Sequence, residues 1–333
     1  MKEIYQIIFS NSSQMNKIKT IIDEIAKTDI TVLIKGETGT GKELLAQMIH
    51  SNSPRKDKPF VKVNCAAIPK GLLESELFGF DKGAFTGAYF RKPGKFELAN
   101  SGTILLNDIG EIDVSIQAKL LEVLQDGVFS RLGGDGEVIV NTRVITTTKD
   151  HLEKSIMEGY FREDLFFRVN VINITLPPLR ERKDQILPLS QYYFDFYKKK
   201  YERNIPSFSS KAVQAFEEYP WPGNIRELEN MVKRIVIFGD ENPVLEDLLS
   251  RSGNNGVNSE PFNNFSPNST TGGENFNLKD AGKRAAEEAE KEIILNTLQE
   301  THWNRKKAAQ LLHVSYKALL NKIQKYHIDD TKG

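Results

Sequence analysis

The glycine-rich segment from Gly36 to Lys42, GETGTGK, constrains the fold most, because it stands between the β-branched run ITVLIK and a helical pattern. Its glycines let backbone N–H groups turn inward around phosphate oxygens, and the N-terminus of the following helix adds positive potential. In this strand–loop–helix context we predict a phosphate-binding loop, with a plain glycine turn as the weaker alternative. The candidate residues are Gly36, Glu37, Thr38, Gly39, Thr40, Gly41, Lys42 and Glu43, the last in place of the Ser or Thr of the general motif.

The pattern between Thr28 and Phe238 alternates β-branched runs with helical stretches, which is typical of a parallel sheet with helices on both faces. We expect an α/β subdomain over residues 1–178 and a helical lid over 179–245. The expected strands are Ile30 to Lys35, Phe60 to Asn64, Thr103 to Leu106, Val138 to Thr146 and Val171 to Leu176. The expected helices are Glu43 to His50, Ile116 to Leu124, Asp184 to Tyr201, Ser210 to Glu218 and Asn224 to Ile237.

The part of the chain after the lid changes character. Residues 246–277 are predicted to be a flexible linker, because 20 of the 26 residues from Ser252 to Asn277 are Asn, Gly, Ser, Thr or Pro. Residues 278–333 are predicted to form a small helix-turn-helix domain, since Thr301 to Ile328 carries six basic side chains and no acid.

The expected core of this small domain is Leu311, Leu312, Val314, Leu319 and Ile323. The alternative for its basic residues is a solvated face without a partner. The candidate DNA-contacting residues are Arg305, Lys306, Ser315, Tyr316, Lys317, Asn321 and Lys322, with Ser315 as the N-cap of the second helix.

Composition excludes several classes of protein. The 45 basic and 45 acidic side chains cancel, so a uniformly basic coat is absent. The one cysteine, Cys65, cannot form an internal disulfide. No apolar run reaches the roughly 18 residues of a membrane span, and no secretory signal is visible. We therefore expect a cytoplasmic protein with no membrane partner.

A second motif is Gly83 to Ala88, GAFTGA, which follows ESELFG. Glycines on both sides of an aromatic and a hydroxyl residue suit a flexible loop tip with a contact residue at its apex. The residues alone leave two interpretations of Phe85 open, a contact residue and a core residue.

Four segments together resemble the AAA+ core of NtrC-like, sigma-54-dependent transcription activators. They are the loop from Gly36 to Glu43, GAFTGA, LPPLRER at 176–182 and WPGNIREL at 221–228. GAFTGA is highly specific to that family. The tail resembles the Fis-type DNA-binding domain that ends many such activators. The resemblance implies an AAA+ P-loop NTPase with a helical lid and an all-α helix-turn-helix domain, without an N-terminal regulatory domain.

The resemblance also implies how such a chain works. Family members form ring oligomers, usually hexamers, and bind ATP with Mg²⁺ between subunits. Hydrolysis moves the GAFTGA loop against the sigma-54 RNA polymerase holoenzyme, while the Fis-type domain binds enhancer DNA as a dimer. The expected sigma-54 contacts are Gly83, Phe85, Thr86 and Gly87.

The resemblance also implies roles for four further residues. Asn64 would link nucleotide state to the catalytic carboxylate, and Arg162 and Arg168 would be arginine fingers that reach a neighbour's nucleotide. Arg226 would sense the nucleotide of its own subunit. For each arginine the alternative is a surface salt bridge. Because the phosphate loop begins at residue 36, we expect regulation by a separate protein in trans or by expression level.

Three positions depart from the family pattern. Asn107 and Asp108 stand where Asp and Glu would hold Mg²⁺ and polarise water, and Lys149 stands where an Asn senses the γ-phosphate. An amide oxygen suits a hard dication less than a carboxylate does. Asp108 is one methylene shorter than Glu, so its carboxylate is displaced from the position that polarises water.

Two interpretations stay open, a working ATPase in which Asp108 takes the metal and an ATP-binding regulator or mixed-ring partner without hydrolysis. A small-molecule P-loop kinase is a third class, which predicts no DNA binding.

Overall fold

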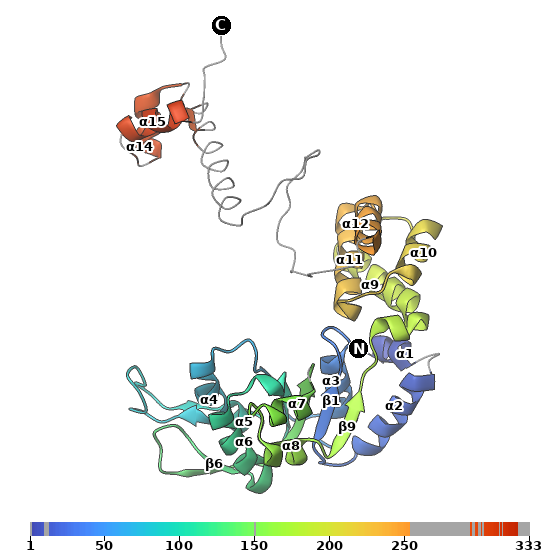
Figure 1. Ribbon diagram of the computed structural model, residues 1–333, viewed down its shortest axis with the longest axis vertical. Coiled ribbons are helices and arrows are strands. Elements are labelled where there is room, and N and C mark those ends of the chain that lie inside the picture. The colour runs from blue at the N-terminus through green and yellow to red at the C-terminus, as the bar shows by residue number, and fades with distance from the viewer. Residues whose placement is uncertain are drawn as a thin grey trace. The chain divides into compact units, whose positions relative to one another are not determined.

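The computed structural model describes residues 2–9, 13–149, 151–253, 294, 297–298, 301, 303–312, 314 and 316–325. The chain divides into two compact units, Met1–Val257 and Asn258–Gly333. In Figure 1 the first unit runs from blue to orange, and it contains the sheet and most of the labelled helices. Within the described residues, no helix is long and apolar enough to cross a membrane.

A five-stranded sheet forms the centre of the described part of the first unit, with the order β2-β5-β8-β1-β9. Every neighbouring pair in this sheet is parallel, which confirms the predicted α/β class. The strands are β1 (Val32–Lys35), β2 (Phe60–Asn64), β5 (Thr103–Asn107), β8 (Arg143–Thr148) and β9 (Ile172–Thr175).

The sheet is covered on both faces because successive apolar residues of its strands point to opposite sides. Val32 and Ile34 of β1 belong to one hydrophobic cluster, whereas Leu33 belongs to the other. In the same way Leu105 faces the first cluster and Leu106 the second. Each of these apolar strands therefore contributes side chains to both hydrophobic clusters.

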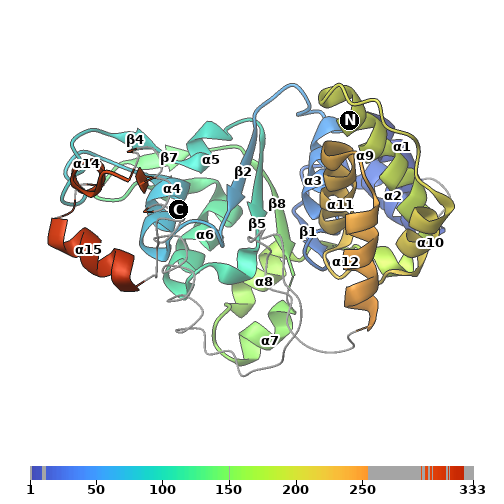
Figure 2. The same cartoon turned by 90° about the horizontal axis from the view of Figure 1, so that it is seen from above.

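The helices divide between these two faces, as Figure 2 shows from above. The first cluster contains residues of α1 (Lys2–Phe9), α2 (Ser13–Ile25), α3 (Lys42–Ser51) and the lid. The second contains residues of α4 (Lys70–Phe78), α5 (Lys95–Leu98), α6 (Val114–Asp126), α7 (Leu152–Met157) and α8 (Glu163–Val169).

The expected strand from Val138 to Thr146 is wrong as a single element. Val138 belongs to β7 (Glu137–Ile139), which pairs antiparallel with β6 (Val128–Ser130) in a separate hairpin. Between this hairpin and β8, the Val140 and Asn141 N–H groups donate to the Gly127 carbonyl and to Asn100 Oδ1. The backbone is thus satisfied outside the main sheet, which it enters at Arg143. A second hairpin joins β3 (Gly79–Phe80) to β4 (Lys92–Pro93).

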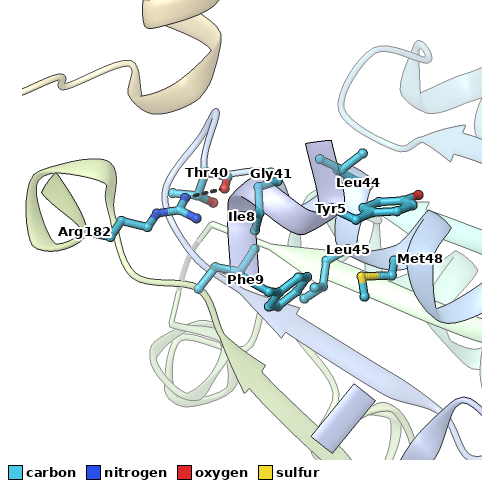
Figure 3. A pocket seen from close by; sticks show the side chains of 10 residues that line it. Tyr5, Ile8, Phe9, Thr40, Gly41, Leu44, Leu45, Met48 and Arg182 are labelled. Atoms are coloured by element: carbon cyan, nitrogen blue, oxygen red, sulfur yellow. Dashed lines mark hydrogen bonds between the residues drawn. The ribbon is translucent and has the colours of Figure 1, made fainter. Parts of the chain in front are cut away.

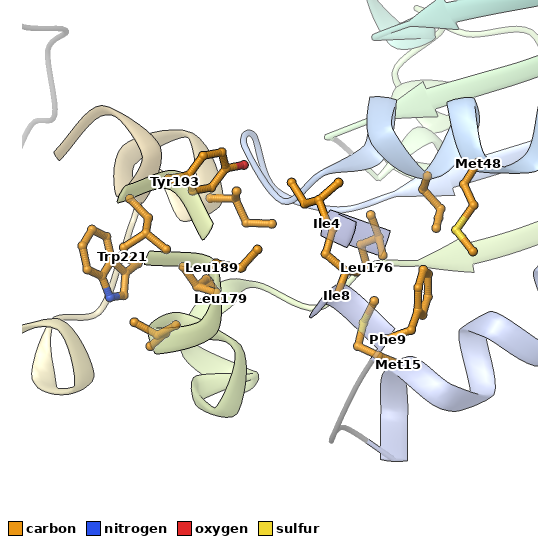
Figure 4. Packing of buried hydrophobic residues seen from close by; sticks show 14 of the residues in the cluster. Ile4, Ile8, Phe9, Met15, Met48, Leu176, Leu179, Leu189, Tyr193 and Trp221 are labelled. Atoms are coloured by element: carbon orange, nitrogen blue, oxygen red, sulfur yellow. The ribbon is translucent and has the colours of Figure 1, made fainter. Parts of the chain in front are cut away.

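The lid consists of helices, as predicted, and its core is centred on Trp221. This side chain is fully buried, and its Nε1–H donates to the Phe216 carbonyl at 2.8 Å. Figure 4 shows Leu189 and Tyr193 of the lid on the side of the cluster that faces Ile4 and Ile8 of α1. The helices are α9 (Ile186–Lys200), α10 (Ser210–Glu218), α11 (Asn224–Phe238) and α12 (Asn242–Gly253). Helix α12 continues past residue 245, where the sequence places the start of the linker.

Helices α1 and α2 were not expected from the sequence. Ile4 and Ile8 of α1 are buried in the cluster that also contains Trp221. The Ile8 carbonyl accepts a hydrogen bond of 2.6 Å from Gln185 Nε2, just before α9. The N-terminal helix thus packs against the lid as well as against the α/β subdomain.

The second unit contains α14 (Arg305–Leu311) and α15 (Tyr316–Lys325). Its buried apolar residues include Leu319 and Ile323, as predicted, but Leu311 is 55% exposed and Val314 36% exposed. Ala308 and Ala309 form the inward face of α14, and Leu311 lies two residues further around the helix. The described core residues are Ile294, Leu298, Ala308, Ala309, Leu319 and Ile323, with Trp303 and Leu312 packed against them.

Candidate functional site

A cavity of about 370 Å³ opens at the carboxyl ends of β1, β2, β5 and β8, between the glycine-rich loop and the lid. Ligands of parallel α/β folds bind at this edge of the sheet. Its lining residues are Ile4, Thr38, Gly39, Gly41, Lys42, Glu43, Leu44, Gln47, Asn64, Asn107, Asp108, Thr147, Tyr193, Ile225, Arg226 and Glu229. The cavity brings most of the predicted loop together with Asn64, Asn107, Asp108 and Arg226.

The glycine-rich loop has a backbone that only glycine adopts readily. Gly39 and Gly41 have φ values of 80° and 101°, in the left-handed region. Helix α3 begins immediately afterwards at Lys42, so its first N–H groups face the cavity end of the loop. Lys42 Nζ donates to the carbonyls of Gly36 and Glu37 at 2.6 and 3.0 Å.

The lid contacts the same loop through several polar groups. Arg180 donates to both carboxylate oxygens of Glu37, at 2.9 and 2.6 Å, and thereby holds the pKa of Glu37 below its usual value. Asn224 Nδ2 donates to Glu37 Oε2 at 3.1 Å, and the Ile225 N–H donates to the Gly39 carbonyl at 3.0 Å. The loop and the start of α11 are therefore held together by direct hydrogen bonds.

A buried arginine, Arg182, donates a hydrogen bond to the backbone of the glycine-rich loop. Arg182 is 1% exposed, and its Nη2 donates to the Thr40 carbonyl at 2.6 Å, the dashed line in Figure 3. Burial lowers the pKa of Arg182 to about 10, which leaves it charged at neutral pH. Figure 3 also shows Ile8 and Phe9 of α1 beside this contact. Three residues of the predicted loop, Gly36, Glu37 and Thr40, do not line the cavity.

The opposite wall of the cavity is formed where β2, β5 and β8 end. Asn64 and Asn107 are register partners. Asp108 follows with φ 55° and ψ 56°, a left-handed conformation. Burial, with a smaller contribution from the Asp108 charge, raises the pKa of the Cys65 thiol to about 12. Asp108 lines the cavity together with Asn64, the last residue of β2.

Thr147, which the sequence analysis did not single out, connects two of these residues. Its Oγ1 accepts from the Asp108 N–H at 3.2 Å and donates to Asn107 Oδ1 at 3.1 Å. Thr147 is 1% exposed and lines the cavity.

Lys149, Arg162 and Arg168 do not line the cavity. Lys149 Nζ lies 2.9 Å from Glu111 Oε1. Arg162 is exposed at the start of α8 and forms a paired hydrogen bond with Asp164. Arg168 is exposed near the end of α8, and its guanidinium donates to the Leu124 carbonyl at 2.9 and 2.6 Å.

The GAFTGA segment forms the turn of the β3–β4 hairpin. Phe85 is 45% exposed and has its ring centroid 4.9 Å from that of Phe80, so it is not a core residue. Gly83 and Gly87 have φ values of 89° and 106°, and Thr86 between them is exposed. The loop therefore presents an aromatic ring and a hydroxyl to the surface.

In the second unit, Arg305, Lys306 and Tyr316 are exposed, and Lys322 is half-buried. Lys317 and Asn321 lie on α15. Ser315 lies outside the described residues.

Several lining residues were missed by the sequence analysis. Ile4 was detectable from the helical spacing of Ile4 and Ile8. Tyr193 and Glu229 come from lid helices, and Tyr197 Oη donates to Glu229 Oε1 at 2.6 Å. Nothing local marks Tyr193 and Glu229, because only the packing of the lid onto the loop places them at the cavity. Gln47 lies on α3, the helix that follows the loop. Among the described residues, no group of three or more His, Cys, Asp or Glu side chains could hold a metal ion.

Three family models match this chain in order. They describe a sigma-54 interaction domain over residues 8–175, an AAA+ ATPase lid domain over 180–263, and a bacterial regulatory protein of the Fis family over 285–326. The first match includes the phosphate-binding loop, the GAFTGA hairpin and the ends of the strands.

Curated relatives and solved structures are similar over most of the chain. The regulatory protein AtoC of Escherichia coli K12 is 43% identical over 97% of this chain and 68% of its own length. The Nif-specific regulatory protein of Klebsiella pneumoniae is 48% identical over 72% of this chain and 45% of its own. The structure of NtrX from Brucella abortus in complex with ADP has a TM-score of 0.68 at 29% identity, and covers 96% of this chain and 69% of that one.

Proposed function

This chain belongs to the family of sigma-54-dependent transcriptional activators, and from that premise we propose that it binds ATP between the subunits of a ring oligomer. In this proposal the GAFTGA loop engages sigma-54 RNA polymerase while the Fis-type unit holds enhancer DNA. The supporting observation is Phe85, an aromatic side chain that is 45% exposed between two glycines with positive φ.

Nucleotide binding is supported by the chemistry of the cavity. Loop N–H groups, Lys42 and Arg226 would hold the phosphates. Ile4, Leu44 and Ile225 supply an apolar side that would receive the base. NtrX, which has this fold, was crystallised in complexes with ADP and with ATP.

A ring is supported by the positions of Arg162 and Arg168. Arg162 is exposed just before α8 and Arg168 is exposed on it, and neither lines the cavity of its own chain. To reach a neighbour's nucleotide, Arg162 would leave Asp164 and Arg168 would leave the Leu124 carbonyl. Both contacts are at the surface, where such pairs contribute little stability.

The donor set fits Mg²⁺ poorly at the two residues proposed to hold it. Asp108 offers a carboxylate, but Asn107 offers a neutral amide whose oxygen already accepts from Thr147. Mg²⁺ prefers carboxylate and phosphate oxygens. We therefore assign no step of the reaction to a metal at these residues.

A second candidate function is favoured by the same wall of the cavity. With Asn107 and Asp108 at the end of β5, and with Lys149 beside Glu111, the chain would bind nucleotide and DNA but hydrolyse ATP slowly or not at all. It would then act as a DNA-bound regulator or as one member of a mixed ring.

ATP turnover separates these two functions. The purified chain is compared with an Asn107→Asp, Asp108→Glu double variant, in the presence of sigma-54 promoter DNA. A large gain in the double variant would support the hydrolysis-deficient regulator. Equal turnover at a rate usual for this family would contradict it.

Open-complex formation at a sigma-54 promoter tests the proposed activator. Phe85→Ala is expected to reduce it by about tenfold or more, as for an interface hot spot, with nucleotide binding retained. Phe90→Ala is the matched control, because Phe90 is 67% exposed on the same hairpin but outside GAFTGA. Equal loss in both variants, or no loss in either, would contradict the assigned contact.

A further inference from the structure

The hydroxyl of Thr147 fixes the side chain of Asn107 in one orientation. Its oxygen already accepts the Asp108 N–H at 3.2 Å, so its single proton is left to donate. Asn107 receives that proton with Oδ1 at 3.1 Å. Because the amide is planar, the NH₂ group of Asn107 then lies on the side of Cγ away from Thr147.

The NH₂ group of Asn107 belongs to a half-buried side chain that lines the cavity together with Lys42. Among the described residues, the NH₂ group of Asn107 donates no hydrogen bond. The N-terminus of α3 and Lys42 make this cavity favourable for anions. An amide donor in such a place matches a phosphate oxygen, whereas an amide oxygen held by a hydroxyl does not match a divalent cation.

We propose that Asn107, oriented by Thr147, donates a hydrogen bond to a phosphate of the bound nucleotide, so that binding depends little on a divalent cation. This inference rests on the proposed nucleotide binding. It gives Asn107 a role different from the metal ligand expected from the sequence, and makes Thr147 a positioning residue.

Equilibrium dialysis of the full chain with a non-hydrolysable ATP analogue tests the inference, with Mg²⁺ or with EDTA. The dissociation constant of the unmodified chain should differ by less than about threefold between the two conditions. Asn107→Ala should weaken binding by about tenfold in both, the size of one hydrogen bond to a charged group. Asn107→Asp should bind tightly with Mg²⁺ only, because its carboxylate repels phosphate when no cation is present.

Two substitutions test the positioning role of Thr147. Thr147→Val removes the hydroxyl at nearly constant volume and should approach the behaviour of Asn107→Ala. Thr147→Ser keeps the hydroxyl and should restore binding in EDTA. Circular dichroism of each variant shows whether it remains folded, and Thr147→Ala takes the place of the Val variant in the comparison with Thr147→Ser if the Val variant does not fold.

The outcomes separate this inference from the proposed function. Strong Mg²⁺ dependence of the unmodified chain, unchanged in Asn107→Asp, would overturn the inference and leave nucleotide binding intact. Thr147→Val and Thr147→Ser with equal affinities would overturn the role of Thr147. No binding in any variant under either condition would overturn the proposed function as well.

Discussion

His50 is a buried imidazole away from the cavity, and it makes the stability of the first unit depend on pH. It is 5% exposed, with Nδ1 2.9 Å from Thr103 Oγ1 and its ring stacked on Phe60. Burial, and then the charge of Arg143, lowers the pKa of His50. The unfolded chain therefore binds the proton more readily than the folded chain does.

The free energy of unfolding should consequently be highest above the unfolded pKa of about 6.5 and fall as the pH drops towards the folded value. Urea denaturation on either side of this pH measures the difference in the free energy of unfolding. The substitution His50→Gln should reduce this difference. An identical pH dependence in the variant would show that other groups cause it.

Gly39 is a position where both the backbone and the space require glycine. Its φ is 80°, and a Cβ there would collide with the Gly223 carbonyl oxygen of the lid. Gly39→Ala should cost at least about 1 to 2 kcal/mol from the left-handed backbone alone, and should weaken nucleotide binding because loop and lid must separate.

Gly71→Ala is the matched control for this substitution. Gly71 lies in α4, and a Cβ added there would meet nothing within 4 Å, so alanine should stabilise the chain slightly. Chemical denaturation and dialysis of both variants check the expectation. Similar behaviour of the two would contradict the close approach of lid and loop.

At the scale of residues, the glycine-rich loop could be predicted from one continuous motif, because its conformation is set by neighbours in the chain. The residues alone left Phe85 open between a contact and a core residue, and its 45% exposure excludes the core. Thr147 was missed because its partners, Asn107 and Asp108, are about forty residues away. Only the parallel pairing of β5 with β8 places them together.

The phosphate loop and the start of the lid form a pair of elements whose coupling is measurable. Glu37 and Arg180 are 43% and 41% exposed, so solvent screens their ion pair and its contribution should be about 0.5 to 1 kcal/mol. A double-mutant cycle with Glu37→Gln and Arg180→Met gives this energy from denaturation curves.

The coupling between Glu37 and Arg180 should also be lost in acid. The folded pKa of Glu37 is lowered, so the interaction is complete above the unfolded value of about 4.3 and disappears as the pH falls through the folded value. A coupling energy that stayed constant across this range would contradict the assignment of Arg180 as the cause.

Helix α1 contributes Ile4, Ile8 and Phe9 to the first hydrophobic cluster. Ile8 is 6% exposed and packs in the cluster shared by loop and lid. Ile8→Ala should lower the free energy of unfolding by about 2 to 5 kcal/mol. Gln6→Ala on the exposed side of the same helix is the control, and an equal effect of both would show that α1 does not pack as described.

At the scale of elements, the sequence predicted four of the five main strands to within a few residues, because buried parallel strands are continuous apolar runs. It failed for Val138 to Thr146, where one β-branched run serves two different sheets. It also missed α1, α2 and α12, whose short apolar patterns are buried only by packing against other helices.

The chain divides into a large unit and a small one. The described core residues of the small unit include two alanines, Ala308 and Ala309. Domains of this size rarely gain more than about 3 to 5 kcal/mol from a single core. If the small unit forms a dimer, as the Fis-type resemblance implies, a fragment of residues 278–333 should have a melting temperature that rises with protein concentration.

Circular dichroism melts at several concentrations, with and without enhancer DNA, measure this dependence. A melting temperature independent of concentration would contradict pairing in the free fragment. At this scale the change in composition at residues 252–277 predicts where the parts of the chain divide, and those boundaries stay a prediction. No local sequence pattern predicts the number of subunits, because that number depends on contacts between separate chains.

The placement of Trp221 gives the molecule a built-in optical probe. The sequence has two tryptophans, one enclosed in the lid core and the other, Trp303, beside the core of the small unit. A chain carrying Trp303→Phe would emit from the lid alone. Stopped-flow fluorescence could then time lid motion after nucleotide mixing without any attached dye.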